Sequence, residues 1–363
     1  MPFNTPPHQI GALFMALQQQ EEQQQQEEQQ QHQTVQFDLS RFGAEESFRE
    51  IFKMTRIELH RICQAMPFDG IQRLACGIKF TLQEGMAIML IKMVYPERFC
   101  LVEVIFGRSK GALSMIATHM MRGIWRRFGR LLQGYLATIR RERLAVFVEA
   151  IAAKGGSVPG CFGFIDGTAI EIARPGRDQE VYYNGHKRLH CIRSNLLVTP
   201  DGLISHFSGL YPGSFHDVTI LRESNVAESI RGLRIRDGQD YVVYGDAGFV
   251  GCRGQYVEGA ARRNMNRFDQ AEVTRMASLR VSVEAIIGRV NALFPFHNVP
   301  KHQHRLHDRN QATRLKYPLA VLFTNCLTCL RRGNQVTSQF DSQALPPTLE
   351  EYLQFPPAQG RAE

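Results

Sequence analysis

Two short apolar runs, each followed by an aspartate, constrain the fold of this chain more than any other feature. The run 162–165 precedes Asp166, and the run 241–244 lies just before Asp246. Runs of this length and composition predict buried strands. A lone carboxylate in such a place costs several kcal/mol in desolvation unless another group pairs with it. The sequence therefore predicts a buried sheet with acids at or near the ends of its strands.

The elements around these runs indicate a mixed α/β fold. The alternating segments 190–202 and 203–214 predict two further strands joined by turn residues. The segment 216–232 is helix-like, and a long helix is expected over 274–293. The resulting order is strand, strand, strand, helix, strand, helix, which predicts a mixed sheet flanked by helices in a domain over 160–333.

Residues 38–150 predict a separate, all-helical domain, because apolar side chains recur there at intervals of three and four. Within it, about 99–130 has the form of a helix-turn-helix. A helix to Phe106 is followed by a glycine-containing turn with Ser109 as the helix cap and then by a second helix. The apolar face of this second helix consists of Leu113, Ile116, Met120 and Ile124.

The two ends of the chain differ in composition from these domains. Residues 1–37 contain a tract of Gln and Glu, which predicts disorder or a solvated helix. Residues 337–363 read as a polar, proline-containing tail, in which one short amphipathic turn at 349–355 could dock. No apolar run reaches the ~18 residues that a membrane span needs, and no secretory signal is recognisable. The eight cysteines are scattered through the chain, which predicts reduced thiols rather than a disulfide framework.

Positive charge is concentrated in one stretch of the helical part. The chain has 43 Lys and Arg against 35 Asp and Glu, a net charge of +8, which admits nucleic acid as a partner. No acid lies between Glu103 and Glu142, whereas a solvated helix normally mixes signs. The stretch predicts a DNA-binding face, with a basic linker that contacts nothing as the alternative. Its eight cations are Arg108, Lys110, Arg122, Arg126, Arg127, Arg130, Arg140 and Arg141.

A third acid, Glu284, lies on the predicted helix 274–293 and shares a face with Arg280 and Asn291. Three converging carboxylates repel each other, and Mg²⁺ or Mn²⁺, which prefer oxygen ligands, relieve that repulsion. Two such ions ~3.5–4 Å apart can activate a water and stabilise the leaving oxygen of a phosphodiester. Two strand acids followed by a helix acid is the order found in RNase H-like nucleases.

Each acid also has a simpler interpretation. Asp166 and Asp246 can be turn-forming residues beside glycines at strand ends. A fourth acid, Asp217, follows the third strand and can be a first-turn acid stabilised by the helix dipole. Taken together, in this order and in a basic protein, the acids favour a metal site.

The segments around these acids resemble the PIF/Harbinger transposases and their domesticated, harbinger-transposase-derived nuclease relatives. The resemblance covers about 80–335 and is strongest in 162–296. It implies a DDE-type endonuclease domain of RNase H-like fold, preceded by a helix-turn-helix. The matching blocks are FGFIDGTAIEI, YYNGHKRLHCIRSNLLVTPDGLI, GLYPGSFHDVTILRES, YVVYGDAGFVG and RVSVEAIIGRVNALFPF.

Carried over by position, the resemblance implies a catalytic triad of Asp166, Asp246 and Glu284, with Asp217 as a further metal ligand and two Mg²⁺ or Mn²⁺ ions. An alternative assignment places Asp217 in the triad. We prefer Asp246, because the thirty-seven residues between it and Glu284 match the interval usual in the family, whereas sixty-six follow Asp217. The motif departs from the family at 286–289, where an aromatic residue and a lysine are usual.

Further cations are candidates for DNA contact. Lys187 and Arg188 precede the second strand and could hold phosphates near the metals, or they could lie on an ordinary solvent-facing hairpin. From the basic stretch we expect Lys110, Arg122, Arg126 and Arg127 to contact the duplex.

The expected function is a divalent-metal-dependent DNA endonuclease and transposase that cuts at element ends and transfers strands to target DNA. One alternative is a domesticated DNA-binding protein that does not cut, and another is a metal-dependent RNase H-like nuclease that acts on other substrates. The resemblance also implies a separate Myb-like DNA-binding partner and action in the nucleus. Self-association into a homo-oligomer is left open, and no membrane partner is expected.

Overall fold

A computed structural model provides the structure of this 363-residue protein. It describes residues 37–95, 100–139, 141–224, 226–231, 233, 241–252, 257–259, 267–298, 312–340 and 344–354. The segment 1–37, for which the sequence predicts disorder or a solvated helix, lies outside the described residues except for residue 37. Among the helices described, none combines the length and the apolar character that crossing a membrane requires.

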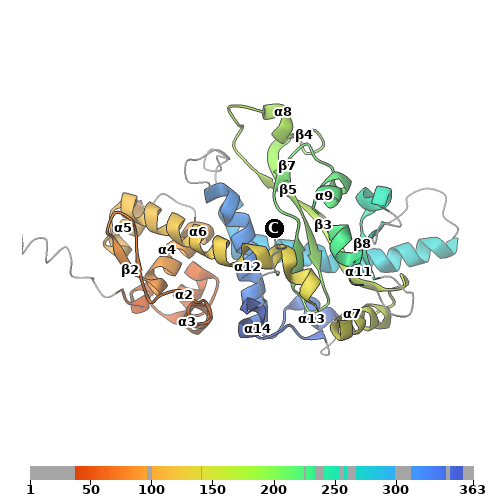
Figure 1. Cartoon of the computed structure of the whole chain (residues 1–363), viewed down its shortest axis with the longest axis horizontal. Helices are drawn as coiled ribbons and strands as arrows, with labels where there is room; N and C mark the ends of the chain where they lie inside the picture. Colours follow the sequence, from red (N-terminus) through yellow and green to blue (C-terminus); the bar gives the residue numbers. More distant parts are fainter. Residues whose placement is uncertain are drawn as a thin grey trace, which may run out of the picture.

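The first part of the chain is helical apart from one short hairpin (Figure 1). Its elements in order are the 3₁₀ helix η1 (Leu39–Phe42), α2 (Glu45–Phe52), α3 (Arg56–Ala65), β1 (Ile71–Arg73), β2 (Lys79–Thr81), α4 (Leu82–Val94), α5 (Cys100–Phe106), α6 (Lys110–Gly134), η2 (Tyr135–Thr138) and α7 (Arg141–Ala153).

Helices α5 and α6 occupy the stretch where the sequence predicts a helix-turn-helix. The Ser109 side chain accepts a hydrogen bond from Ala112 N, so it caps α6 as expected. The predicted apolar face is buried, but it packs into the interior, against α4, α12 (Ala312–Leu330) and β6 (Ile204–Phe207). The 25 residues of α6 therefore form a central support, and its role in DNA binding stays a prediction.

The second part contains a mixed sheet, as the sequence predicts. Along the sheet the strands run β4 (Tyr183–Asn184), β5 (Leu189–Val198), β3 (Cys161–Glu171), β8 (Val242–Gly245) and β9 (Val257–Gly259). β6 and the short β7 (Tyr211–Pro212) also pair with β5. β5 is antiparallel to β3, whereas β3, β8 and β9 are parallel. The remaining elements are α8 (Gln179–Tyr182), α9 (Asp217–Glu223), α10 (Val226–Arg231), η3 (Ala247–Cys252), α11 (Arg267–Leu293), η4 (Pro295–Asn298), α13 (Gln335–Phe340) and α14 (Leu349–Leu353).

A single cluster of buried hydrophobic side chains extends through both parts of the chain. Helix α12 joins them, because it packs against α6 and also against α11 and β6 (Figure 1). Its Cys326 and Cys329 are buried thiols, with exposed fractions of 0% and 1%. The segments predicted as two domains, 38–150 and 160–333, thus share one core.

The segment 337–363, which the sequence suggests is a tail, is docked over much of its described length. Phe340 of α13 stacks on Phe164 of β3, with ring centroids 5.9 Å apart. In α14, Leu349 and Tyr352 are buried, and the Tyr352 hydroxyl accepts a hydrogen bond from Asn325. These few apolar side chains supply enough buried area to offset the entropy of ordering the chain, despite its polar composition.

Candidate active site

Strands β3 and β8 and helix α11 bring Asp166, Asp246 and Glu284 together. Phe164 of β3 pairs with Tyr244 of β8 in parallel register, and two residues further on are Asp166, within β3, and Asp246, directly after the end of β8. The helix α11 packs across β3. From it, Arg280 Nη1 lies 3.5 Å from Asp166 Oδ2 and Arg280 Nη2 lies 2.8 Å from Glu284 Oε1. One guanidinium group therefore bridges the acid of β3 and the acid of α11.

Burial and like charge disfavour the ionised form of Asp166. The pKa of its carboxyl group is raised from 3.8 to about 6, mainly by desolvation and to a smaller extent by the charges of Asp246 and Glu284. A hydrogen bond from Gly167 N, at 2.9 Å, and the charge of Arg280 act in the opposite direction. Both neighbouring acids are thus near enough to Asp166 to affect its ionisation.

Asp217 approaches the same strand from its other face. Because side chains alternate along a strand, Asp166 and Thr168 point to one side of β3 while Gly167 and Ala169 point to the other. Arg193 of β5 lies opposite Ala169 and therefore shares the second side. Its Nη2 donates to both Asp217 oxygens, at 2.8 and 3.0 Å, and its Nη1 donates to Phe215 O.

Two glycines allow this close arrangement. A Cβ on Gly167 would overlap Asp217 Oδ1, so a side chain at that position and the observed carboxylate exclude each other. A Cβ on Gly248 would lie 2.9 Å from Asp246 Oδ1 and 3.6 Å from Asp217 Oδ2. These two carboxylates are therefore neighbours at the end of β8, although Asp217 and Asp166 lie on opposite sides of β3.

All four acids fall within the part of the chain that resembles known proteins. Residues 165–322 match the model of a family described as DDE superfamily endonuclease. The match begins one residue before Asp166 and extends well beyond Glu284, into α12. A nuclease-like or transposase-like role is therefore what the match suggests for this domain. Searches of curated proteins and of solved structures gave no match.

The acids have the donor chemistry of a magnesium or manganese site, because all their ligand atoms are carboxylate oxygens. When ionised, the four acids outnumber Arg193 and Arg280 by two charges, which one divalent cation balances. However, no three His, Cys, Asp or Glu side chains in the described part of the chain are arranged to hold a metal ion. In the structure, guanidinium groups pair with Asp166, Glu284 and Asp217.

The predicted DNA-contacting residues lie on other elements. Lys187 and Arg188 are exposed in the turn between β4 and β5, and the amide of Lys187 donates to Asn184 Oδ1. On α6, Arg126 and Arg127 are exposed, Arg122 is half-buried, and Lys110 Nζ lies 3.5 Å from Glu103.

Arg108, also in the basic stretch, is engaged in the interior. Its Nε lies 2.5 Å from Glu84 Oε1, and the Glu84 side chain is only 3% exposed. Glu84 follows Thr81 by three residues, the spacing of a capping box at the start of α4. The Thr81 hydroxyl does accept from Glu84 N, but the Glu84 carboxylate binds Arg108 instead. Arg108 is thereby unavailable for a phosphate without exposing a buried acid.

Sequence reasoning missed Arg193, the main partner of Asp217. The only sequence signal is a cation within the otherwise apolar and small-residue run of β5. A cation in a strand predicted to be buried is expected to pair with an acid, and the Arg193 side chain is indeed only 13% exposed. Which acid it pairs with depends on the register of β3 and β5, which the sequence does not specify.

Proposed function

We propose that this protein is a divalent-metal-dependent DNA endonuclease and transposase of the PIF/Harbinger type, with an RNase H-like catalytic domain. The observation that carries the proposal is the convergence of Asp166 in the middle of β3, Asp246 just after β8 and Glu284 on α11. The matched endonuclease family, whose members typically use divalent metals, supports the same chemistry.

In this proposal Asp166, Asp246 and Glu284 hold the metal. Bound Mg²⁺ or Mn²⁺ ions would activate the attacking water and stabilise the leaving oxygen of the phosphodiester. Asp217 would contribute a ligand only by sharing an oxygen that now accepts from Arg193. A second cation, as the sequence suggests, is favoured by the extra negative charge that the phosphates of a bound strand bring.

Residues of the chain prepare this site in other ways. Arg280 fixes the position of Glu284 through their i,i+4 ion pair and offsets the repulsion between Glu284 and Asp166. The exposed Lys187, Arg188, Arg126 and Arg127 neutralise phosphates of double-stranded DNA. We also propose action in the nucleus with a Myb-like DNA-binding partner, as the family resemblance implies.

A domesticated DNA-binding protein without cutting activity is the second candidate. One observation favours it: two arginines already pair with three of the four acids. In such a protein those ion pairs would stabilise the fold and leave no need for a metal.

Nicking of supercoiled plasmid DNA tests the proposal. The purified full chain is incubated with Mn²⁺ or Mg²⁺, and separately with chelator, next to the variant Glu284→Gln. The proposal predicts nicked circles only for the wild type with metal. Salt-dependent binding of duplex DNA by both proteins, with no nicking by either, would instead support the second candidate.

A further inference from the structure

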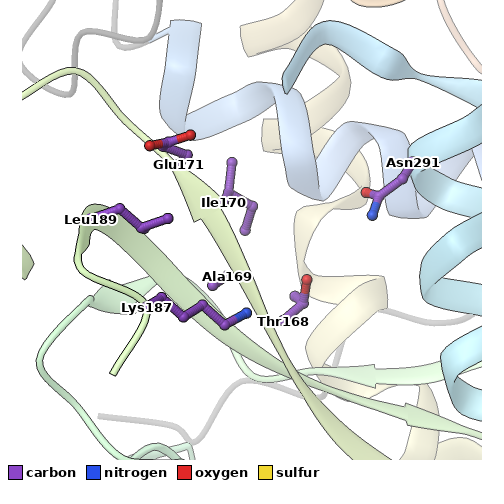
Figure 2. A pocket seen from close by; sticks show the side chains of 7 residues that line it. All are labelled: Thr168, Ala169, Ile170, Glu171, Lys187, Leu189 and Asn291. Carbon is purple, nitrogen blue, oxygen red and sulfur yellow. The ribbon is translucent and has the colours of Figure 1, made fainter. Parts of the chain in front are cut away.

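A pocket of about 280 Å³ lies between β3, the turn into β5, and α11 (Figure 2). Figure 2 shows Lys187 reaching into it from the β5 side and Asn291 from the opposite side. Sequence reasoning drew attention to Lys187 but not to a cavity. The residues that line the pocket are Thr168, Ala169, Ile170, Glu171, Lys187, Leu189 and Asn291.

This pocket continues directly from the acids. Thr168 follows Asp166 by two residues on the same side of β3, a distance of ~7 Å along the strand. Asn291 follows Glu284 by seven residues, about two helical turns and ~10 Å along the same face of α11. A DNA strand with one phosphodiester at the acids would therefore place its adjoining nucleotide at the pocket.

The lining suits a nucleobase better than a phosphate. Ile170 and Leu189 offer apolar surface to the flat face of a base. The Asn291 carboxamide, which makes no hydrogen bond with another described residue, can both donate to and accept from a base edge. Glu171 would repel a phosphate placed deep in the pocket.

Lys187 supplies the complementary charge at the entrance. Its side chain is exposed, and within the described residues its ammonium group makes no ion pair. If a base occupied the pocket, the phosphate of the same nucleotide would remain at the entrance. A cation at the entrance can pair with that phosphate.

We propose that this pocket binds one unpaired base of the DNA strand, from the nucleotide next to the phosphodiester that is cut. The inference rests on the proposed function, since it is the acids that fix the position of the strand. Taking a base out of a duplex costs a few kcal/mol, and an end that is already unpaired avoids this cost. The pocket therefore favours DNA with single-stranded ends.

Fluorescence anisotropy with the full chain in chelator tests the pocket without any cutting. The probes are labelled duplexes that carry three unpaired nucleotides, at the 3′ or the 5′ end, and the same duplexes with abasic residues at those positions. The wild type should bind one normal overhang about tenfold more tightly than its abasic counterpart, which is the effect of roughly one hydrogen bond with some apolar burial.

Asn291→Leu should reduce this ratio to about twofold, because a side chain of similar size loses the base contact. Gln270→Leu, an exposed position on the same helix, should leave the ratio unchanged. Lys187→Gln should weaken both overhangs equally and reduce the salt dependence by about one ion.

The proposal of base binding is overturned if the ratio of affinities for normal and abasic overhangs is the same in the wild type and in Asn291→Leu. It is also overturned if the wild type shows no preference for the normal overhang. If the wild type still nicks plasmid with metal in that case, the proposed function survives without it. If the protein shows a base preference that depends on Asn291 but never nicks DNA, base binding in the pocket is supported and the proposed endonuclease activity is overturned.

Discussion

Arg193 binds Asp217 through both carboxylate oxygens, on the side of β3 opposite to the side chain of Asp166. The pair is largely shielded from water, with side-chain exposures of 13% and 21%. One nitrogen, Nη2, donates to both carboxylate oxygens, and charge-assisted hydrogen bonds of this kind are stronger than those between neutral groups. It ties the start of α9 to β5 and so holds the loop that leads to the acids.

We therefore expect Asp217→Asn and Arg193→Gln each to lower the free energy of unfolding by about 1–3 kcal/mol, because each leaves a charged partner only partly satisfied. Urea unfolding of the two single variants and the double variant measures this. The double variant should lose less than the two single losses added together. Strict additivity would mean that the pair does not act as a unit.

Gly167→Ala should disturb the site through Asp217. The new methyl group overlaps Asp217 Oδ1, so the pair with Arg193 must shift, and we expect a loss of about 1–3 kcal/mol in unfolding free energy together with slower nicking. The matched control is Gly288→Ala on α11, where the added carbon would lie in open space, with nothing beyond its own stretch of helix within 4 Å. That variant should be as stable as the wild type or up to ~1 kcal/mol more stable. Similar losses in both variants would contradict this account.

Asp166 should make the protein less stable as the pH rises. Its pKa is about 6 in the folded protein and near 3.8 when unfolded, so between these values the folded state binds more protons. The unfolding free energy therefore falls as pH rises through this interval and stays lower above pH 6. Asp166→Asn should match the wild type below pH 4 and exceed it by up to about 3 kcal/mol at pH 7.

Urea unfolding in chelator at pH 4 and pH 7 measures this difference, with the exposed Asp69→Asn as control. The control should show the same difference from wild type at both pH values. If the unfolding free energies of Asp166→Asn and the wild type differ by the same amount at both pH values, burial does not raise the pKa of the Asp166 carboxyl group.

The acids and their supporting elements were predictable because local signals mark them. Apolar runs before Asp166 and Asp246 predict the strands, and the long helix around Glu284 was expected where α11 is found. The pairing of Arg193 with Asp217 was not predictable, because it depends on the register that places Arg193 opposite Ala169. Because side chains alternate along a strand, a shift of one residue in this register would move Arg193 to the other face of the sheet, and the sequence does not specify the register.

The shared core was hidden for a similar reason. The apolar face of α6 predicts burial but not the partner, and the partner includes α12, about two hundred residues further along. In the same way, the amphipathic pattern of 349–355 predicts that this segment can dock, but it does not identify the partner, which includes Asn325 of α12. Long-range packing of this kind is not encoded in local composition.

The exposed arginines of α6 should contribute to DNA affinity, whereas Arg108 should not. Arg126→Gln combined with Arg127→Gln should reduce the salt slope of duplex binding by about two ions. Arg49→Gln combined with Lys154→Gln removes the same charge from exposed positions elsewhere and is the control. Titration of a labelled duplex at several salt concentrations measures the slopes. Equal slopes in the two double variants would assign the effect to net charge rather than to this helix.

Nicking rates of Asp246→Asn and Asp217→Asn, measured side by side with Mn²⁺, test the central claim most directly. In the proposed site, Asp246 acts with Asp166 and Glu284 at the reacting phosphodiester, whereas Asp217 is engaged in an ion pair with Arg193. Asp246→Asn should therefore lose at least about a thousandfold in rate, equivalent to about 4 kcal/mol. Asp217→Asn should stay within about tenfold of the wild type. The reverse order, with Asp217→Asn inactive and Asp246→Asn active, would contradict the assignment.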